Sequence, residues 1–405
     1  DIYLITDPLS VRPMHYQQIY YQEDPSKEGC LKETMFQGLA ISSLAKGLVD
    51  GEEKIFPLNH KVKRLQCGET RHYKFNPDNN TVQFVKSMYY HEYIRPLMHR
   101  SEENTKLYTD YDNVLKQAVY RRVKNTDVPL CVLISGGLDS YTVALYAAQI
   151  CKELGQSLAS FSIGMKGSTD LKFAKLAAQK LGTVHTEIIY TKEEALSIIP
   201  DVIRCIESFD TTTVRASVAQ YILAKYIREK TPYRVILNSD GSDEVNMGYM
   251  YFHLAPNSTE AQLESNKLTT KITFFDGLRV DRTLSHWGLE PRVPFEDIDY
   301  VDFVYNIEPR LKIPDMANGR MEKYLLRKTL EVLYGDTSYF VKDIVWRAKE
   351  AFSDGVSDDR GKPWYIIAKE HAETQFSQED ANCIIELAKR NGSYCVPTTI
   401  EEAWY

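Results

Sequence analysis

The chain has 405 residues with 43% hydrophobic and 26% charged residues, a composition typical of a globular protein with two or three domains. No apolar run approaches the 18 residues of a membrane-spanning helix, so we expect no membrane partner. The formal net charge is −7 and basic residues are scattered, which argues against a nucleic-acid partner. The seven cysteines lack CxxC spacing and an even count, which predicts reduced thiols in a cytosolic, cytoplasmic protein.

The first 90 residues predict antiparallel β structure with one short helix. Short extended segments at 1–6, 31–41, 72–75 and 82–89 alternate with turn signals such as the Asn-Pro-Asp-Asn run that begins at Asn76. A charged stretch over 99–106 predicts a linker, and we expect domains at 1–95 and 96–405.

The second part predicts an α/β fold with a doubly wound parallel sheet. Apolar runs typical of buried parallel strands alternate there with amphipathic helices. The expected strands are 128–134, 158–165, 184–190 and 234–238, and the expected helices are 110–124, 138–154, 170–181, 192–208 and 213–229. Beyond Glu244 we expect mainly helices, and Thr399 with Glu402 forms a capping box that starts one more. The first residue, Asp1, lies inside a strand-like segment, and this last helix starts close to Tyr405, so both ends are expected to be cut.

The hexapeptide Ser135-Gly136-Gly137-Leu138-Asp139-Ser140 follows the first of these strands and opens a helix. Parallel sheets bind ligands at that place, since glycines allow close backbone approach and a helix N-terminus favours phosphate. Bare phosphate would repel Asp139, so its presence predicts a bridging Mg²⁺. If only the two glycines are considered, the alternative to a phosphate site is a helix-capping turn that merely needs glycine.

A second acidic loop, Asn238-Ser239-Asp240-Gly241-Ser242-Asp243-Glu244, ends another apolar strand. Three acids in five positions are costly unless they are solvated or face a cation. Paired with the first loop, Asp139 and Asp243 predict a two-carboxylate Mg²⁺ site.

Two other patterns carry no such prediction. His91-Glu92 lacks the second histidine of a zinc-protease helix. His185 and Glu187 alternate on an expected strand, and we favour a structural role for them.

Six motifs in order make the chain resemble the asparagine synthetase family. They are SGGLDS at 135–140, TTVRAS at 212–217, GSDE at 241–244, GLEPRVPFED at 288–297, EKYLLR at 322–327 and WRAKEAFSDG at 346–355. The N-terminal part is similar to the rear half of that family's glutaminase domain, in TDPLSVRP at 6–13 and LAKGLVDG at 44–51. The front half, with its catalytic cysteine, is expected to lie outside this chain.

The resemblance implies a PP-loop sheet of the adenine nucleotide α-hydrolase type, preceded by part of an Ntn-type glutaminase domain. It implies that Mg²⁺ and ATP activate L-aspartate as β-aspartyl-AMP with release of pyrophosphate, and that ammonia, or L-glutamine in the intact protein, supplies the nitrogen. A homodimer is implied as well.

The resemblance also implies roles for individual residues. Catalytic roles fall to Asp240, Lys349 and Arg215, and aspartate binding to Thr212 and Arg215. ATP and pyrophosphate would contact Ile134, Ser135, Gly136, Gly137, Asp139, Ser140, Ile163, Asn238 and Ser239, and Asp7 is a remnant of the glutamine site.

Three positions depart from the family pattern. Asp240 replaces a glutamate, which retracts the carboxylate by about one methylene and predicts reduced turnover. Ser10 replaces the glycine of the first glutaminase motif and Leu44 the glutamate of the second, which places glutamine use in question.

Two alternatives stay open. One is another adenylating amide ligase of the same fold, acting for example on a β-lactam precursor, whose relatives carry a tyrosine where this chain has Asp240. The other is a binding homologue with impaired catalysis, which the retained Ser135, Arg215 and Lys349 argue against.

Overall fold

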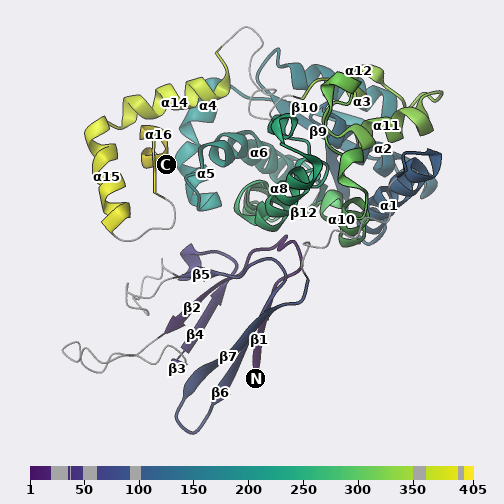
Figure 1. Cartoon of the computed structure of the whole chain (residues 1–405). Helices are drawn as coiled ribbons and strands as arrows, with labels where there is room; N and C mark the ends of the chain where they lie inside the picture. The colour runs from purple at the N-terminus through teal and green to yellow at the C-terminus, as the bar shows by residue number, and fades with distance from the viewer. Residues whose placement is uncertain (20–34, 37, 49–61, 92–101, 350–361, 391–395) are drawn as a thin grey trace. The chain divides into compact units, whose positions relative to one another are not determined.

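A computed structural model describes residues 1–19, 35–36, 38–48, 62–91, 102–349, 362–390 and 396–405 (Figure 1). The chain divides into two compact units. The first contains residues 1–95 and 267–274, and the second contains 96–266 and 275–405. The predicted linker over 99–106 lies partly outside the described residues, and its last two residues already belong to a helix that Asn104 caps.

The first unit is antiparallel β structure, as the sequence predicted. One sheet has the order β1-β6-β7-β3 and another the order β4-β2-β5, with every pair antiparallel. The strands are β1 (Ile2–Ile5), β2 (His15–Ile19), β3 (Met35–Phe36), β4 (Gly38–Ser42), β5 (Lys63–Arg64), β6 (Glu69–Asn76) and β7 (Thr81–Tyr89), and the short helix is η1 (Lys46–Leu48). Strand β2 was not predicted, because its HYQQI sequence is polar and lacks apolar alternation.

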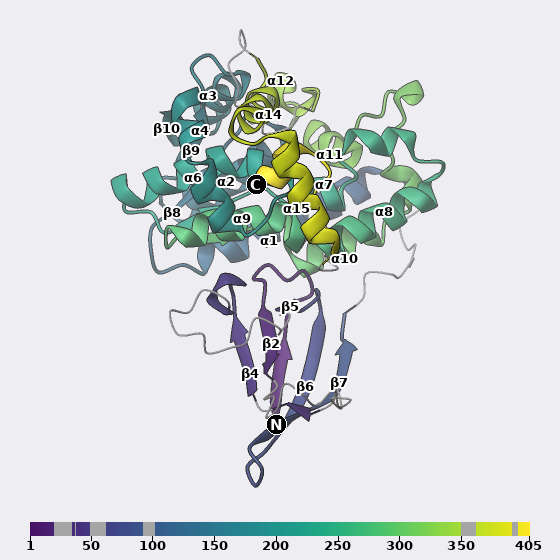
Figure 2. The same cartoon turned by 90° about the vertical axis from the view of Figure 1, so that its left-hand side faces the viewer.

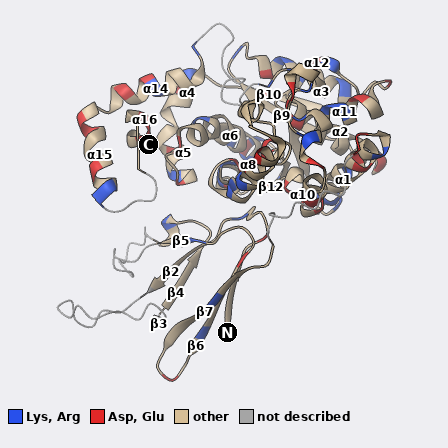
Figure 3. Ribbon diagram, viewed as in Figure 1, with Lys and Arg blue, Asp and Glu red and all other residues tan. Residues whose placement is uncertain are grey.

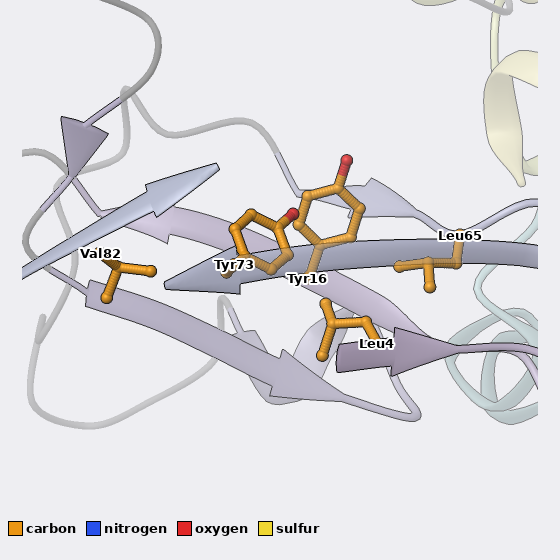
Figure 4. Packing of buried hydrophobic residues seen from close by; sticks show 5 residues of the cluster. All are labelled: Leu4, Tyr16, Leu65, Tyr73 and Val82. Atoms are coloured by element: carbon orange, nitrogen blue, oxygen red, sulfur yellow. The ribbon is translucent and has the colours of Figure 1, made fainter. Parts of the chain in front are cut away.

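Alternation along the strands builds the core of this unit. Leu4 is buried while its neighbours Tyr3 and Ile5 are exposed, as expected when successive side chains point to opposite faces. Figure 4 shows the buried cluster, which consists of Leu4, Tyr16, Leu65, Tyr73 and Val82.

The second unit contains a five-stranded parallel sheet, which confirms the predicted α/β class. Its order is β10-β9-β8-β11-β12, with β8 (Leu130–Leu133), β9 (Ala159–Gly164), β10 (Val184–Ile189), β11 (Val235–Leu237) and β12 (Glu290–Arg292). Strands β9 and β10 lie on one side of β8, and strands β11 and β12, which come later in the chain, lie on its other side. With right-handed crossovers, this reversal places helices on both faces of the sheet.

Helices surround this sheet (Figure 2). The α-helices are α1 (Thr105–Lys124), α2 (Leu138–Glu153), α3 (Thr169–Leu181), α4 (Lys192–Ser197), α5 (Ile199–Ile206), α6 (Thr211–Lys230), α7 (Ser242–Val245), α8 (Ser258–Lys271), α9 (Asp276–His286), α10 (Ile298–Tyr305), α11 (Tyr324–Tyr334), α12 (Lys342–Val345), α14 (Trp364–Gln375), α15 (Gln378–Arg390) and α16 (Ile400–Trp404). Short 3₁₀ helices are η2 (Met250–Leu254), η3 (Ile272–Phe274), η4 (Pro294–Glu296), η5 (Pro309–Leu311) and η6 (Met316–Asn318). Within the described residues, no helix combines the length and apolarity needed to cross a membrane.

Local chemistry fixes the helix ends. Ser168 caps the N-terminus of α3, and Gly182 ends that helix in the left-handed conformation with φ of 69°. Helix α15 begins with Glu379 and Asp380 and ends with Lys389 and Arg390, a distribution that complements the helix dipole (Figure 3).

Two predicted elements differ in the structure. The single helix expected at 192–208 is two helices, α4 and α5, because Pro200 stands in the first turn of α5 and favours a new helix start at that point. Strand β12 lies in the region expected to be mainly helical.

Strand β12 is the last strand in the sheet order and contains Pro291. The nitrogen of Glu290 and the oxygen of Arg292 bond toward β11, to Arg234 and Asn238. Because backbone groups alternate in direction along a strand, the nitrogen of Pro291 faces the outer edge. A proline is tolerated there, since no ladder bond of this sheet needs its N–H.

Candidate active site

The two loops singled out in the sequence line one cavity of about 390 Å³ in the second unit. Ser135 follows β8 and Asn238 follows β11, and these strands are adjacent and parallel. The cavity therefore opens at the carboxyl ends of the strands, the usual binding edge of such a sheet. The lining residues are Leu133, Ile134, Ser135, Gly137, Leu138, Asp139, Ser140, Phe161, Ser162, Ile163, Asp170, Thr212, Ala216, Gln220, Leu223, Asn238, Ser239, Asp240, Gly241, Asp243, Glu244, Tyr249, Asp276, Arg279, Glu322, Lys323, Arg327, Arg347, Ala348 and Lys349.

The first loop is a compact turn held by its own hydroxyls. The backbone N–H of Ser135 donates to Ser140 Oγ over 3.1 Å, and the two hydroxyl oxygens lie 3.0 Å apart. Gly137 stands at the N-cap of α2 without a side-chain cap, which leaves the first N–H groups of that helix open to a ligand.

Gly136 makes this turn possible for two reasons. Its φ is 80°, a left-handed value that glycine adopts without strain. A Cβ atom there would lie 2.5 Å from Phe173 Cβ and 2.6 Å from the backbone nitrogen of Ala174. The loop thus packs directly against helix α3.

The second loop turns in a similar way. Asn238 Oδ1 accepts a hydrogen bond from the Asp240 N–H over 3.1 Å, and Gly241 has φ of 89° at the N-cap of α7. Both the Asp240 carboxylate and the Asp243 carboxylate reach the cavity from this turn.

One lysine lies between the two predicted metal ligands. Lys323 Nζ donates to Asp139 Oδ2 and lies 2.8 Å from Asp243 Oδ1. Ser242 donates its hydroxyl to the other oxygen of Asp139 over 2.7 Å. The structure therefore brings Asp139 and Asp243 to a shared cation, which here is the lysine ammonium.

Lys349 reaches the same carboxylate. Its Nζ donates to Asp243 Oδ1 and lies 5.0 Å from the ring centre of Tyr249. Burial alone would raise the pKa of Asp243, but Lys323 and Lys349 together hold it below its usual value. Buried Arg327 holds the segment before Lys349 by donating to the carbonyl oxygen of Val345 over 2.6 Å.

A third group surrounds Asp240. Arg279 bridges Asp240 and Asp276, with Nη1 2.7 Å from Asp276 Oδ1. Burial raises the pKa of Asp240 to about 6, although Arg279 opposes the shift. The Tyr249 hydroxyl lies 2.5 Å from Glu244 Oε1 and 2.8 Å from Asp276 Oδ2, within hydrogen-bond distance of both carboxyl groups.

Seven acidic and five basic side chains line the cavity. A polyphosphate would meet net negative charge there unless cations enter with it. In the described part of the chain, no cluster of three or more His, Cys, Asp or Glu could hold a metal. Two carboxylates within reach of one nitrogen still fit Mg²⁺, which commonly takes one or two protein carboxylates and completes its shell with water and phosphate.

Helix α6 forms one wall. Thr212, Ala216, Gln220 and Leu223 follow helical spacing and line the cavity on one face. The Gln220 side chain is buried, and its Nε2 has no hydrogen-bond partner among the residues that the structure describes.

Arg215 points elsewhere and does not line the cavity. Its Nε donates to Glu401 Oε1 over 2.8 Å, and its Nη2 donates to Glu401 Oε2. The Tyr405 hydroxyl donates to the same carboxylate over 2.7 Å. The guanidinium predicted to bind aspartate is thus engaged by the C-terminal helix α16.

The remaining predicted residues divide between the units. Ile134 and Ile163 are buried and line the cavity. Asp7 lies in the first unit, where its Oδ1 accepts the N–H groups of Leu9 and Val11 over 3.0 and 3.2 Å. His185 contacts Ser160 and Ser162 through its two ring nitrogens, at 2.8 and 3.0 Å.

The sequence reasoning missed Lys323, Arg279, Asp276, Tyr249 and Gln220 as cavity residues. Lys323 lies inside the EKYLLR motif, so the motif signalled the segment without indicating the side chain. Asp276 and Arg279 sit one helical turn apart at the start of α9, and nothing in their spacing relates them to Asp240.

Comparison with known proteins gives one family. The family model described as asparagine synthase matches residues 110–275 and 268–402. The glutamine-hydrolyzing asparagine synthetase of Cricetulus griseus is 35% identical over 380 residues, and that of Homo sapiens is 37% identical over 381 residues. Each alignment covers 91% of this chain and 65% of the relative, so the chain spans about two thirds of the length of these relatives.

Solved structures resemble the chain more distantly. A glutamine-dependent NAD⁺ synthetase from Acinetobacter baumannii is 14% identical with a TM-score of 0.33, covering 86% of this chain and 53% of that one. An NAD⁺ synthetase from Burkholderia pseudomallei is 15% identical with a TM-score of 0.28, covering 59% of this chain and 89% of that one.

Proposed function

This chain belongs to the asparagine synthase family, and we propose that its second unit makes L-asparagine from L-aspartate, ATP and ammonia. The β-carboxylate of aspartate attacks the α-phosphorus of ATP, pyrophosphate leaves, and ammonia displaces AMP from the β-aspartyl adenylate. The observation that carries the proposal is the cavity that joins the Ser135–Ser140 loop to the Asp240–Glu244 loop.

The nucleotide fits the half of the cavity beside β8 and β9. Apolar walls from Ile134, Phe161, Ile163 and Leu223 suit an adenine ring, and the open N-terminus of α2 suits its phosphates. Asn238 and Ser239 add polar atoms around this space, and Thr212, predicted to bind aspartate, lines the same cavity.

Pyrophosphate release needs positive charge at the leaving group. Mg²⁺ held by Asp139 and Asp243 would supply it when bound, by neutralising charge on the phosphate oxygens. Lys349 already lies beside Asp243 on the cavity wall, so its ammonium can stabilise the departing phosphates without a large movement.

Ammonia must meet the adenylate at a group that can take a proton. Asp240 lines the cavity, and its pKa of about 6 lies closer to neutral pH than that of an ordinary aspartate. We assign it the role of steering and deprotonating the incoming amine. Arg279 keeps this carboxylate oriented.

The aspartate contact assigned to Arg215 remains a prediction. A substrate carboxylate would have to compete with Glu401, which already binds the guanidinium at two points. Gln220, buried on the same helix with an Nε2 that has no partner in the described part of the chain, is an alternative donor for that carboxylate.

Membership of the family also suggests a role for the first unit, a cellular location and an oligomeric state. We propose that the first unit, including Asp7, is the rear part of a glutaminase domain, so that glutamine is the nitrogen source of the intact protein. We also propose a cytosolic location and a homodimer.

The proposal is tested by ATP–pyrophosphate exchange with and without L-aspartate, together with asparagine formation from ammonium. We expect exchange that depends on aspartate and is lost in Asp139→Asn. Exchange that depends on a different carboxylate would indicate another adenylating ligase. The absence of exchange with any carboxylate, from protein that binds ATP, would indicate a binding homologue.

A further inference from the structure

The ammonium of Lys323 occupies the position between the two carboxylates proposed to hold a metal. Its Nζ donates to Asp139 Oδ2 and lies 2.8 Å from Asp243 Oδ1. The Lys323 side chain is only 4% exposed. A single buried cation therefore links the loop after β8 to the loop after β11.

This spacing is close to that of a divalent site. Two oxygens within hydrogen-bond distance of one nitrogen lie at most about 6 Å apart. Mg²⁺ binds oxygens at about 2.1 Å, so the two carboxylates need to approach by only an ångström or two to share it. Ser242, which donates to the other oxygen of Asp139, keeps that carboxylate aimed at the site.

Two backbone features accommodate the Lys323 side chain. Lys323 itself adopts a left-handed conformation, with φ of 57° at the N-cap of α11. A Cβ at Gly248 would lie 2.0 Å from Lys323 Cε, so a glycine leaves the channel through which the side chain passes. A strained backbone and a cleared path are more than a chance surface ion pair requires.

The Lys323 side chain can also move away from the two carboxylates, because it borders open space in the cavity. It lines the same cavity as the Ser135–Ser140 loop, and its flexible stem carries a compact point charge. Lys349 remains on Asp243 if Lys323 leaves, whereas among the described residues Lys323 is the only cation on Asp139.

We propose that Lys323 is a placeholder cation, which fills the divalent-metal position in the nucleotide-free protein and exchanges with the metal when a metal–polyphosphate enters. Once displaced, its ammonium pairs with the phosphate oxygens. The inference rests on the proposed nucleotide site. It explains how two partly buried carboxylates, 21% and 23% exposed, stay neutralised before the metal arrives, since a charge removed from water without a partner is costly.

The first test measures Mn²⁺ binding to nucleotide-free protein by electron paramagnetic resonance. In Lys323→Met the two carboxylates lose their shared ammonium, so we expect Mn²⁺ affinity to rise on the order of ten-fold over the unmodified chain. Adding Asp139→Asn should remove this gain. Lys328→Met, on the same helix α11 and paired with Glu331, serves as the control and should change nothing.

The second test measures binding of magnesium pyrophosphate by calorimetry. Lys323→Met should weaken it on the order of ten-fold, because a cation is missing from the phosphate shell. Opposite shifts for the metal alone and for the metal–phosphate pair are not expected of a merely structural lysine. If Lys323→Met melts at a lower temperature than the parent, both measurements are repeated with Lys323→Gln.

Unchanged or weaker Mn²⁺ binding in folded Lys323→Met or Lys323→Gln would overturn the placeholder role, as would failure of every form to bind Mn²⁺. Neither assay contains aspartate or ATP. A protein that shows the opposite shifts and yet makes no asparagine would therefore contradict the proposed function while supporting the role of Lys323.

Discussion

Arg215 and Glu401 are joined by a two-point guanidinium–carboxylate contact that ties the second turn of α6 to the C-terminal helix α16. The Glu401 side chain is 4% exposed and that of Arg215 is 17% exposed. The indole of Trp364, on α14, donates to the Arg215 carbonyl oxygen over 3.0 Å. The C-terminal segment thus supports the helix that forms one wall of the cavity.

Removing the charge of Glu401 should destabilise the second unit. In Glu401→Gln the largely buried Arg215 loses its counter-charge, and we expect the free energy of unfolding to fall by about 2 kcal/mol. Urea titration followed by circular dichroism measures this. The exposed Glu386→Gln on α15 is the control and should stay within about 0.5 kcal/mol of the parent. Equal effects from the two variants would show that the pair contributes nothing.

Alanine substitutions at Gly182 and Gly136, two glycines with similar positive φ, distinguish the cost of backbone strain from the cost of a steric clash. Gly182→Ala has φ of 69° and open space around its Cβ, so we expect a cost of about 1 kcal/mol. Gly136→Ala adds contacts of 2.5 and 2.6 Å with helix α3 and should cost roughly 2 kcal/mol more. Thermal melts compare the two, and ATP binding should be lost only in Gly136→Ala. Matching losses of stability would mean that α3 yields to the added methyl.

Ser10 is expected to be a stabilising target. It adopts φ of 50°, is 1% exposed and, within the described ranges, leaves its hydroxyl without a hydrogen-bond partner. Ser10→Gly relieves both costs, and we expect a gain of about 1 kcal/mol in the unfolding of the first unit. Asn80, exposed with φ of 51°, is the matched control, since asparagine tolerates this conformation and Asn80→Gly should change stability little. A loss of stability in Ser10→Gly would contradict the expectation.

Lys312 should make stability depend on pH. Burial lowers its pKa from 10.5 to about 7, and its Nζ donates to Gln262 and to the Val304 carbonyl oxygen. Above pH 7 the unfolded chain still binds a proton that the folded chain has released, so stability rises with pH. Between pH 7 and 9 we expect the parent to gain about 2 kcal/mol relative to Lys312→Met. Urea titrations at the two pH values measure the gain, and a constant difference would place the lysine pKa near its ordinary value.

The shorter acid at Asp240 should let water compete for the adenylate. A carboxylate displaced by about 1 Å can slow a step about 100-fold, and capture of ammonia is the step that Asp240 serves. We therefore expect the parent to release more pyrophosphate than it forms asparagine, and Asp240→Glu to move the ratio toward one. Parallel assays of the two products test this. A ratio of one in both proteins would show that Arg279 already holds the shorter acid where it is needed.

Local sequence signals predicted the parts of the site that lie on two short loops. Ser135 to Ser140 and Asn238 to Glu244 each follow an apolar strand, so their types and spacing were enough to place them at one edge of a sheet. The same reasoning located the capping of α16 by Thr399, whose Oγ1 accepts the Glu402 N–H over 3.1 Å.

Residues that depend on tertiary packing could not be predicted in this way. Lys323 and Asp139 are separated by 184 positions, and Arg279 and Asp240 by 39, so no local spacing relates them. The engagement of Arg215 by Glu401 joins positions 186 apart. Strand β12 was missed because Pro291 is a poor strand former, and only the edge position of β12 accommodates it.

Pro291 also affects whether strand β12 can pair with a strand of another molecule. An open edge strand offers a row of unpaired N–H and C=O groups that can template pairing with another chain. At β12 the donor in the middle of a three-residue edge is missing, because a proline ring occupies that position. A second molecule that tried to extend the sheet there would find a carbonyl without its neighbouring N–H. Pro291 is itself buried, so at this residue the border of the sheet that carries the active-site loops lacks both a donor and an accessible surface for further pairing.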